Sequence, residues 1–264
     1  MSLAGRLLLL PSWLALLLLV VVIVGLSLLA FKLVSRRVPH YLMKPHNDVA
    51  GFIFAVIGVM YGVILGFDIY MVWQDLDHAQ KVSAFESGEA MGLHRDLALY
   101  PDAESAAPVR KALVEFIQSV VKDEYPAMAR MQQSDRTNVL FDRLWDTLHG
   151  LHPRDPLELI IYQEILEDMN RLAKFRLERL EAAASELPSV VWLTLMVGGI
   201  ITISFTFFFG SENVRAHVIM TALLAAMVAT VIFVIVELDH PFMGEVSIKP
   251  DHYVRLLNYI GLDR

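Results

Sequence analysis

Residues 187–209 read LPSVVWLTLMVGGIITISFTFFF and residues 214–236 read VRAHVIMTALLAAMVATVIFVIV, with only the four residues GSEN between them. Each stretch is mostly apolar and is longer than the roughly 20 residues that an α-helix needs to cross a hydrocarbon core of about 30 Å. Inside lipid, a single spanning segment satisfies its backbone hydrogen bonds only as a helix. The pair therefore predicts two transmembrane helices joined by a tight turn.

A second pair of apolar stretches lies in the N-terminal part of the chain, at residues 7–34 and 49–72. The first stretch is longer than the roughly 7–15 apolar residues of a secretory signal peptide, and the basic residues Lys32, Arg36 and Arg37 close it. We therefore expect a retained helix. In a chain of 264 residues with a mean hydropathy of +0.51, the four stretches predict an all-α integral membrane protein with four transmembrane helices in two hairpins.

The residues between the two hairpins differ in character, because they hold most of the acidic side chains of a chain whose net charge is −7. An acidic insert argues against a nucleic-acid partner, since binding phosphates requires a basic surface. Capping and proline signals predict helices in this insert over residues 108–124, 135–149 and 155–185. The predicted organisation is a transmembrane hairpin over 1–74, an acidic helical extramembrane domain over 75–186, a second hairpin over 187–237 and a polar C-terminal tail over 238–264.

The second apolar stretch carries a ridge of small residues, in which Gly58, Gly62 and Gly66 recur every four residues. Such ridges let helix backbones approach closely, because lipid supplies no hydrophobic drive for helix association. One interpretation is close packing between helices of one chain. The other is a contact between subunits, or a pore wall whose constriction is formed by the pore-lining candidates Phe54, Tyr61 and Phe67.

The sequence offers no convincing site for metal or cofactor chemistry. It contains no cysteine, and histidines such as His40, His46 and His149 do not fall at a spacing typical of a zinc site. Neither a Gly-x-Ser-x-Gly nucleophile motif nor a phosphate-binding glycine loop occurs. We therefore expect no bound metal, no cofactor and no enzymatic activity.

Three acidic residues lie where predicted membrane helices end, namely Asp68 near the end of the second stretch and Glu237 and Asp239 after the fourth. Ionisable groups inside a bilayer are costly and often functional. At this position in the sequence, however, a helix end in contact with water is the favoured interpretation, and no acid or base falls in the middle of a predicted span.

Several phrases of the sequence occur together in one known family. They are Asn47-Asp48-Val49-Ala50-Gly51-Phe52-Ile53, then Glu86 and Arg95, Asp123-Glu124-Tyr125-Pro126, Arg176-x-x-Arg179-Leu180, Leu187-Pro188 with Trp192, and Leu238-Asp239-His240-Pro241-Phe242-x-Gly244. With these phrases the chain resembles the bestrophin-like family of bacterial membrane proteins, long catalogued as a domain of unknown function. The resemblance covers about residues 32–250, and Asp239, Pro241, Phe242 and Gly244 form its structural motif after the fourth helix.

The family name implies kinship with bestrophins, which are pentameric anion channels whose second membrane helix lines the pore. For this chain the resemblance implies a homo-oligomer in a lipid bilayer, with small anions as partners. The chain lacks the run of acids and the proline pair of the bestrophin pattern, which puts calcium gating in doubt. Arg95, Arg176 and Arg179 are candidates for attracting anions, although arginines on an acidic domain more often form salt bridges.

Orientation and function stay open at this point. The basic flank of the first helix places the insert outside the cell by the positive-inside rule, whereas the resemblance favours a cytoplasmic insert in a bacterial inner membrane. A non-conducting scaffold or sensor, whose insert binds another protein, is the alternative to a channel. In either case we expect Pro241 and Phe242 to anchor the tail against the helices of the insert.

Overall fold

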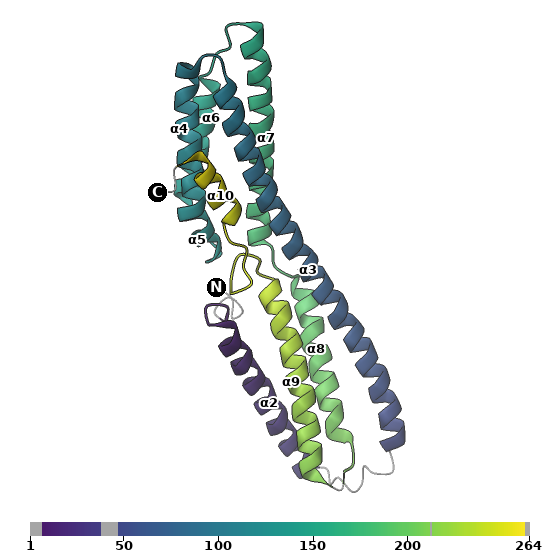
Figure 1. The fold of residues 1–264 in the computed structure, drawn as a ribbon. Helices are drawn as coiled ribbons and strands as arrows, with labels where there is room; N and C mark the ends of the chain where they lie inside the picture. Colours follow the sequence, from purple (N-terminus) through teal and green to yellow (C-terminus); the bar gives the residue numbers. More distant parts are fainter. Residues whose placement is uncertain (1–6, 38–46, 212, 262–264) are drawn as a thin grey trace. The chain divides into compact units, whose positions relative to one another are not determined.

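The structure, a computed structural model, describes residues 7–37, 47–211 and 213–261, so the histidines His40 and His46 lie outside the described residues. All regular structure in the described ranges is helical, which confirms the predicted all-α class (Figure 1). Four helical ranges are long and apolar enough to cross a membrane. They are Ser12–Arg37, Asn47–Leu99, Pro156–Phe208 and Val214–Leu238.

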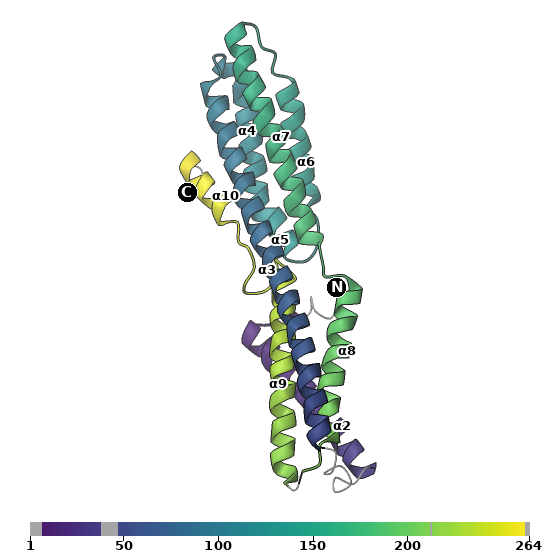
Figure 2. The same ribbon diagram turned by 90° about the vertical axis from the view of Figure 1, so that its right-hand side faces the viewer.

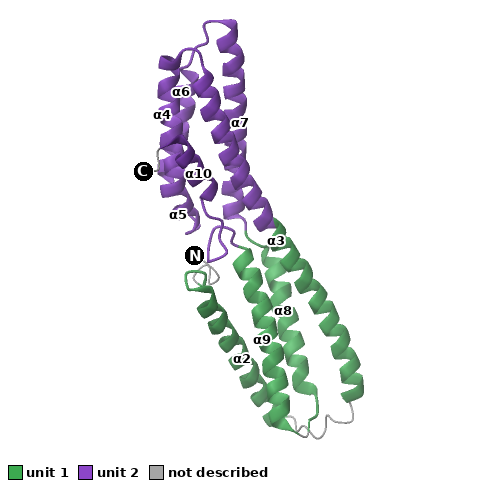
Figure 3. Cartoon of the chain, in the orientation of Figure 1, with its two compact units in different colours: residues 1–74, 186–239 green, residues 75–185, 240–264 purple. Residues whose placement is uncertain are grey.

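The chain divides into two compact units (Figure 3). Unit 1 comprises Met1–Gln74 and Glu186–Asp239, and unit 2 comprises Asp75–Ser185 and His240–Arg264. The long helix α3 (Asn47–Leu99) contributes its first part to unit 1 and its second part to unit 2. The predicted stretches 7–34 and 214–236 end within three residues of the ends of the observed helices Ser12–Arg37 and Val214–Leu238, and the second stretch continues as one helix far beyond residue 72.

The regular structure of unit 1 is helical throughout its described residues. Besides the first part of α3, its elements are α2 (Ser12–Arg37), α8 (Ser189–Phe205), the 3₁₀ turn η4 (Thr206–Phe208) and α9 (Val214–Leu238). Helices α2 and α9 pack along much of their length, as Figure 1 shows.

Two contacts define how α2 runs along α9. At one end the Ser12 hydroxyl donates to the Glu237 carboxylate at 2.8 Å. At the other end the ring of Phe31 lies 4.8 Å from the ring of His217, edge to face. The two helices are therefore antiparallel, and the last turn of α2, with Arg36 and Arg37, lies at the same end of unit 1 as the start of α9.

Unit 2 is a helical bundle, which Figures 1 and 2 show from two sides. Besides the second part of α3, its elements are α4 (Ala103–Ser119), the π-helix η3 (Val120–Glu124), α5 (Tyr125–Met128), α6 (Asp135–His149), α7 (Pro156–Ala184) and α10 (Asp251–Ile260). Their apolar side chains form one core, to which α10 contributes Tyr253, Leu256 and Leu257. The polar tail predicted over 238–264 thus contains a helix that its composition did not indicate.

The predicted start of the first insert helix at residue 108 was wrong. Helix α4 begins at Ala103, because the Asp102 side chain accepts a hydrogen bond from the Ser105 backbone N–H and caps the helix. Pro108 lies inside the helix. The predicted start and end of α6 agree with the structure.

Candidate functional site

Helix α3 contacts the rest of unit 1 through one narrow stripe. Within its membrane-length part, the buried residues are Tyr61, Leu65, Asp68 and Val72. Their spacing of three and four residues places them on one helix face. Most of the remaining surface of this part of α3 is exposed, and only 11% of its most apolar window is buried, against 39% for α9. Unit 1 therefore leaves most of α3 to be covered by something other than its own chain.

Two of the predicted pore-lining aromatic residues belong to the covered side of α3. The Tyr61 hydroxyl donates to the backbone oxygen of Leu195 in α8 at 3.0 Å. A Cβ atom added to Gly198 would lie 2.6 Å from the Tyr61 ring, so this glycine is what allows the ring to approach α8. The Phe54 ring stacks on Phe205, with 5.9 Å between the ring centroids. In a single chain, both aromatic residues face α8.

The glycine ridge lies on another side of α3. A Cβ atom added to Gly58, Gly62 or Gly66 would meet no heavy atom within 4 Å. Close packing between the described helices of one chain therefore does not account for the ridge. Phe67 is also exposed, at 68%.

The ridge and Phe67 do not share a face, however. At about 100° per residue, Gly62 and Phe67 point roughly 140° apart around α3. The six pore-lining candidates thus fall on three sides of the helix, with Phe54 and Tyr61 inward, the ridge on one exposed flank and Phe67 on the other.

The two arginines of α7 proposed to attract anions form buried ion pairs in unit 2. Arg179 is fully buried, and its guanidinium donates to both carboxylate oxygens of Glu86 and, at 2.5 Å, to Glu124. Arg176 donates to the other oxygen of Glu124 at 2.5 Å and to the Asn138 side chain at 2.7 Å. This is the salt-bridge alternative of the sequence analysis. Buried and neutralised guanidinium groups have no charge left for a passing anion.

Glu124 occupies the centre of this four-residue charge cluster of Glu86, Glu124, Arg176 and Arg179. Burial alone would raise the pKa of the Glu124 carboxyl, but the adjacent Arg179 and Arg176 outweigh it and hold the pKa below its ordinary value. Glu124 ends the π-helix η3 and is followed by Tyr125-Pro126. A π-helical turn is wider than an α-turn, and it accommodates a proline that has no N–H to donate and whose ring crowds the preceding turn.

Arg95 is the third predicted anion-attracting residue, and its situation is different. It lies on α3 in unit 2, its side chain is exposed, and it forms no ion pair with the described residues. Of the three arginines, it alone presents an uncompensated charge to solvent.

The motif of Asp239, Pro241, Phe242 and Gly244, after the fourth membrane helix, forms packing and hydrogen-bonding contacts in both units. In unit 1 the Asp239 carboxylate accepts from the Leu187 backbone N–H at 2.9 Å. In unit 2 the buried Phe242 ring packs edge-on against Tyr125 at 5.8 Å. Gly244 has a φ of 74°, a left-handed conformation that favours glycine. The Pro241 carbonyl accepts from the Ile248 N–H at 2.8 Å and closes this turn.

Asp68 is not the water-exposed helix end that its sequence position suggested. Its side chain is 7% exposed, and its Oδ2 atom is buried without a hydrogen-bond partner among the described residues. Asp68 follows Tyr61 by seven residues on the covered stripe of α3, so the helical period was the signal for its burial.

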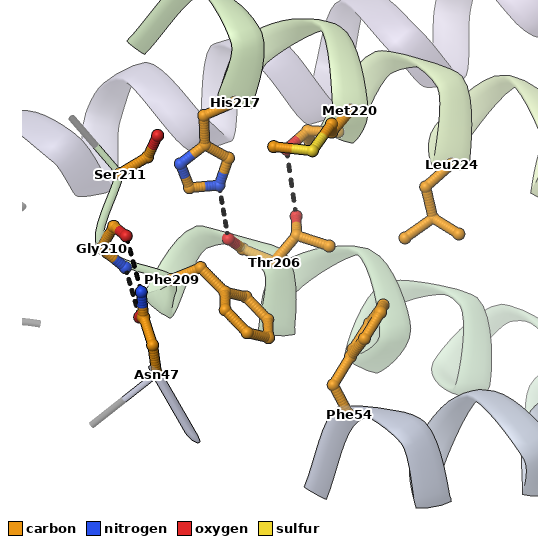
Figure 4. Close-up of a pocket in the computed structure, with 10 residues that line it drawn as sticks. Asn47, Phe54, Thr206, Phe209, Gly210, Ser211, His217, Met220 and Leu224 are labelled. Atoms are coloured by element: carbon orange, nitrogen blue, oxygen red, sulfur yellow. Dashed lines mark hydrogen bonds between the residues drawn. The ribbon is translucent and has the colours of Figure 1, made fainter. Parts of the chain in front are cut away.

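Unit 1 also contains a cavity of about 420 Å³ between the start of α3, the end of α8 and the start of α9 (Figure 4). At one end the Asn47 side chain exchanges two hydrogen bonds with the backbone of Gly210, at 2.8 and 2.9 Å. Beside it, His217 Nε2 lies 2.8 Å from the Thr206 carbonyl oxygen, which can only accept, so Nε2 carries the hydrogen. The sequence analysis did not identify this cavity, because its walls come from three separate helices.

This architecture is similar to that of known proteins. A family model described as the Bestrophin-like domain matches residues 21–253. Crystal structures of a bacterial bestrophin homologue from Klebsiella pneumoniae share the fold. One, determined by zinc phasing, has a TM-score of 0.65 at 16% identity over 93% of this chain and 98% of that one. Another, with a single substitution, has a TM-score of 0.66 at 15% identity over 93% and 99%.

No curated protein matches the chain. The structural similarity to the solved structures, at 15% and 16% identity, shows the fold alone. The family model covers most of the sequence, including all four apolar helical ranges in whole or in part. The chain is a membrane protein, and it belongs to the family defined by the Bestrophin-like domain.

Proposed function

We propose that this protein is a homo-oligomeric ion channel in which α3 lines the pathway and the permeant species are anions. The observation that carries the proposal is the outward-facing ridge of Gly58, Gly62 and Gly66 on α3. Small residues on an exposed helix face allow another backbone to come close. A spanning helix that is barely covered by its own chain offers this face to further copies or to a central pathway.

The permeant species and the pentameric assembly rest on the resemblance to bestrophins. The net charge of −7 disfavours anions, so an anion pathway has to be locally basic, and Arg95 is the remaining candidate for gathering anions. Hydrophobic constrictions gate channels by dewetting. Because Phe54 and Tyr61 face α8, we assign the width of the pathway to the ridge and retain Phe67 as the aromatic candidate.

We further propose that residues 1–74 and 187–237 cross a bacterial inner membrane as two hairpins, while 75–186 and 238–264 stay outside the bilayer in the cytoplasm. The buried charge cluster and the surface ion pairs of unit 2 suit an aqueous domain. Labelling of a Val139→Cys variant, exposed in unit 2, tests the side. A membrane-impermeant maleimide should label it only after cells are permeabilised, and labelling of intact cells would reverse the orientation.

The decisive experiment measures chloride and potassium flux separately from liposomes that contain the purified full chain. We expect chloride flux from the wild type, a large loss in Gly62→Leu and little change in Val63→Leu. Val63 is the matched control, because it is exposed and adjacent but turned about 100° from the ridge. Equal effects of the two substitutions would contradict a role for the ridge.

Assembly is tested independently of conduction. The chain has no cysteine, so single cysteines at Gly58, Gly62 or Gly66 report only their own neighbours. Self-crosslinking along this one stripe supports the oligomer. Folded protein that neither crosslinks nor conducts either ion would favour the alternative, a membrane-anchored scaffold or sensor whose insert binds another protein.

A further inference from the structure

The cavity in unit 1 has a polar end and an apolar end. Asn47 and His217 mark the polar end, and Phe54 and Leu224 mark the apolar end (Figure 4). Asn47 and Phe54 are seven residues apart on α3, and His217 and Leu224 are seven residues apart on α9, so the two ends of the cavity are separated by about 10 Å along each helix axis. A pocket of a few hundred cubic ångströms between helices, mostly apolar with a few placed polar groups, has the usual character of a ligand site.

The polar end lies where basic side chains gather. Arg215 is exposed in the first turn of α9, two residues before His217; it lies at the level of the polar end but about 160° around the helix from the lining residue His217. Arg36 and Arg37 end α2, about 8 Å beyond the contact of Phe31 with His217, which brings them level with the start of α9. The acids Asp48, exposed in the first turn of α3, and Glu212, three residues before Arg215 in the sequence, offset part of this charge.

Polar groups in the lining of the cavity are hydrogen-bonded to one another, so they do not require a polar ligand. Asn47 is paired with Gly210, and the Thr206 hydroxyl lies 3.2 Å from that of Thr221. Apolar cavities of this kind stay dry and take up apolar groups. Met220 lines the cavity and is 58% exposed, so the cavity reaches the outer surface of unit 1, where acyl chains are the surrounding solvent.

We infer that this cavity binds an acyl chain of an anionic phospholipid, whose headgroup is attracted by the positive charge of Arg215, Arg36 and Arg37 at the level of the polar end. The acyl chain lies between Phe54 and Leu224, where it supplies van der Waals contacts to cavity walls that no side chain of unit 1 covers. The phosphate adds attraction to the arginines near the membrane surface. This inference does not depend on ion conduction.

The test uses the purified full chain, stripped of lipid in a detergent with an uncharged headgroup. Native mass spectrometry then measures retention of phosphatidylglycerol and of phosphatidylcholine with identical acyl chains. Leu224→Trp fills the cavity, and Leu223→Trp is the matched control, because Leu223 is the neighbouring residue of α9, is 65% exposed and does not line the cavity.

We expect Leu224→Trp to lose about tenfold in affinity for both lipids, as when two methylene groups lose their burial, while Leu223→Trp behaves as the wild type. Arg215→Gln should lower affinity for phosphatidylglycerol about fivefold and leave phosphatidylcholine unchanged. Equal lipid affinity of the two tryptophan variants would overturn the acyl-chain site. An Arg215→Gln variant that keeps its preference for phosphatidylglycerol would overturn the headgroup assignment.

A second variant guards against misfolding of Leu224→Trp. Leu224→Cys supplies the chain's single thiol, which a bulky thiol reagent blocks after folding. Loss of lipid retention on blocking, at unchanged circular dichroism, supports the site, and undiminished retention contradicts it.

Discussion

Removing Arg179 tests whether the buried charge cluster stabilises unit 2. In Arg179→Met, Glu86 loses both of its hydrogen bonds to the guanidinium and keeps no cation among the described residues, although its side chain is fully buried. Glu124 retains Arg176 at 2.5 Å. Breaking a buried pair by removing one partner costs about 3–5 kcal/mol, which corresponds to a fall in Tm on the order of 10 °C.

The assay is thermal unfolding of the full chain in nanodiscs, followed by tryptophan fluorescence. Replacing Trp13, Trp73 and Trp192 by Phe leaves Trp145 of α6 as a reporter inside unit 2. Arg143→Met is the matched control, because its side chain is 60% exposed in an ion pair with Glu115, and such pairs contribute less than about 1 kcal/mol.

The double variant Glu86→Gln with Arg179→Met identifies the cause. It restores a neutral cluster of Glu124 and Arg176, so we expect it to recover at least half of the lost stability. An Arg179→Met protein that melts within about 2 °C of the wild type, or a double variant less stable than the single one, would refute this reasoning.

Three further outcomes are expected from melting experiments on the full chain. The folded-state pKa of Glu124 lies below its unfolded value of about 4.3, so its stabilisation is complete above that pH and is lost as the pH falls through the folded pKa; the difference in Tm between wild type and Glu124→Gln should therefore shrink below about pH 4, and a constant difference would contradict this. Gly198→Ala should destabilise by about 1–3 kcal/mol, because its methyl would overlap the Tyr61 ring, whereas Gly62→Ala has open space and should melt normally in detergent. Asp68→Leu should raise the unfolding free energy by about 1–3 kcal/mol, because it removes a buried polar atom that has no hydrogen-bond partner among the described residues, and a fall would reveal a partner or ligand of Asp68.

The sequence was sufficient for the membrane helices, because length and apolar composition alone identify a spanning helix. The sequence did not, however, predict which side of α3 packs against the other helices of unit 1. Both the packed side and the open side of such a helix are apolar in lipid, so the pattern does not distinguish Tyr61, which packs on α8, from Phe67, which is exposed. The glycine ridge had the same ambiguity, and only the positions of neighbouring helices resolved it for a single chain.

The arginines of α7 illustrate a different limit. Arg176 and Arg179 are three residues apart and share a helix face, which the sequence does show. Their acidic partners do not follow from local pattern, since Glu86 is 93 residues from Arg179 and Glu124 is 55. Helix α10, by contrast, could have been predicted from the helical spacing of Tyr253, Leu256 and Leu257. It was missed because the composition of the segment is mostly polar.

The π-helix η3 makes the charge cluster depend on chain length as well as on residue identity. A π-turn holds one residue more than an α-turn. Deleting one residue between Val120 and Lys122 would turn the π-turn into an α-turn and keep Glu124 in phase with α4, because the wider turn absorbs that one residue. The same deletion inside the regular helix α4 would instead rotate Glu124 by about 100° relative to the start of α4, away from Arg176 and Arg179. A one-residue gap is therefore tolerated at η3 and not in α4, and a relative with the gap at η3 could keep the same partners for its arginines.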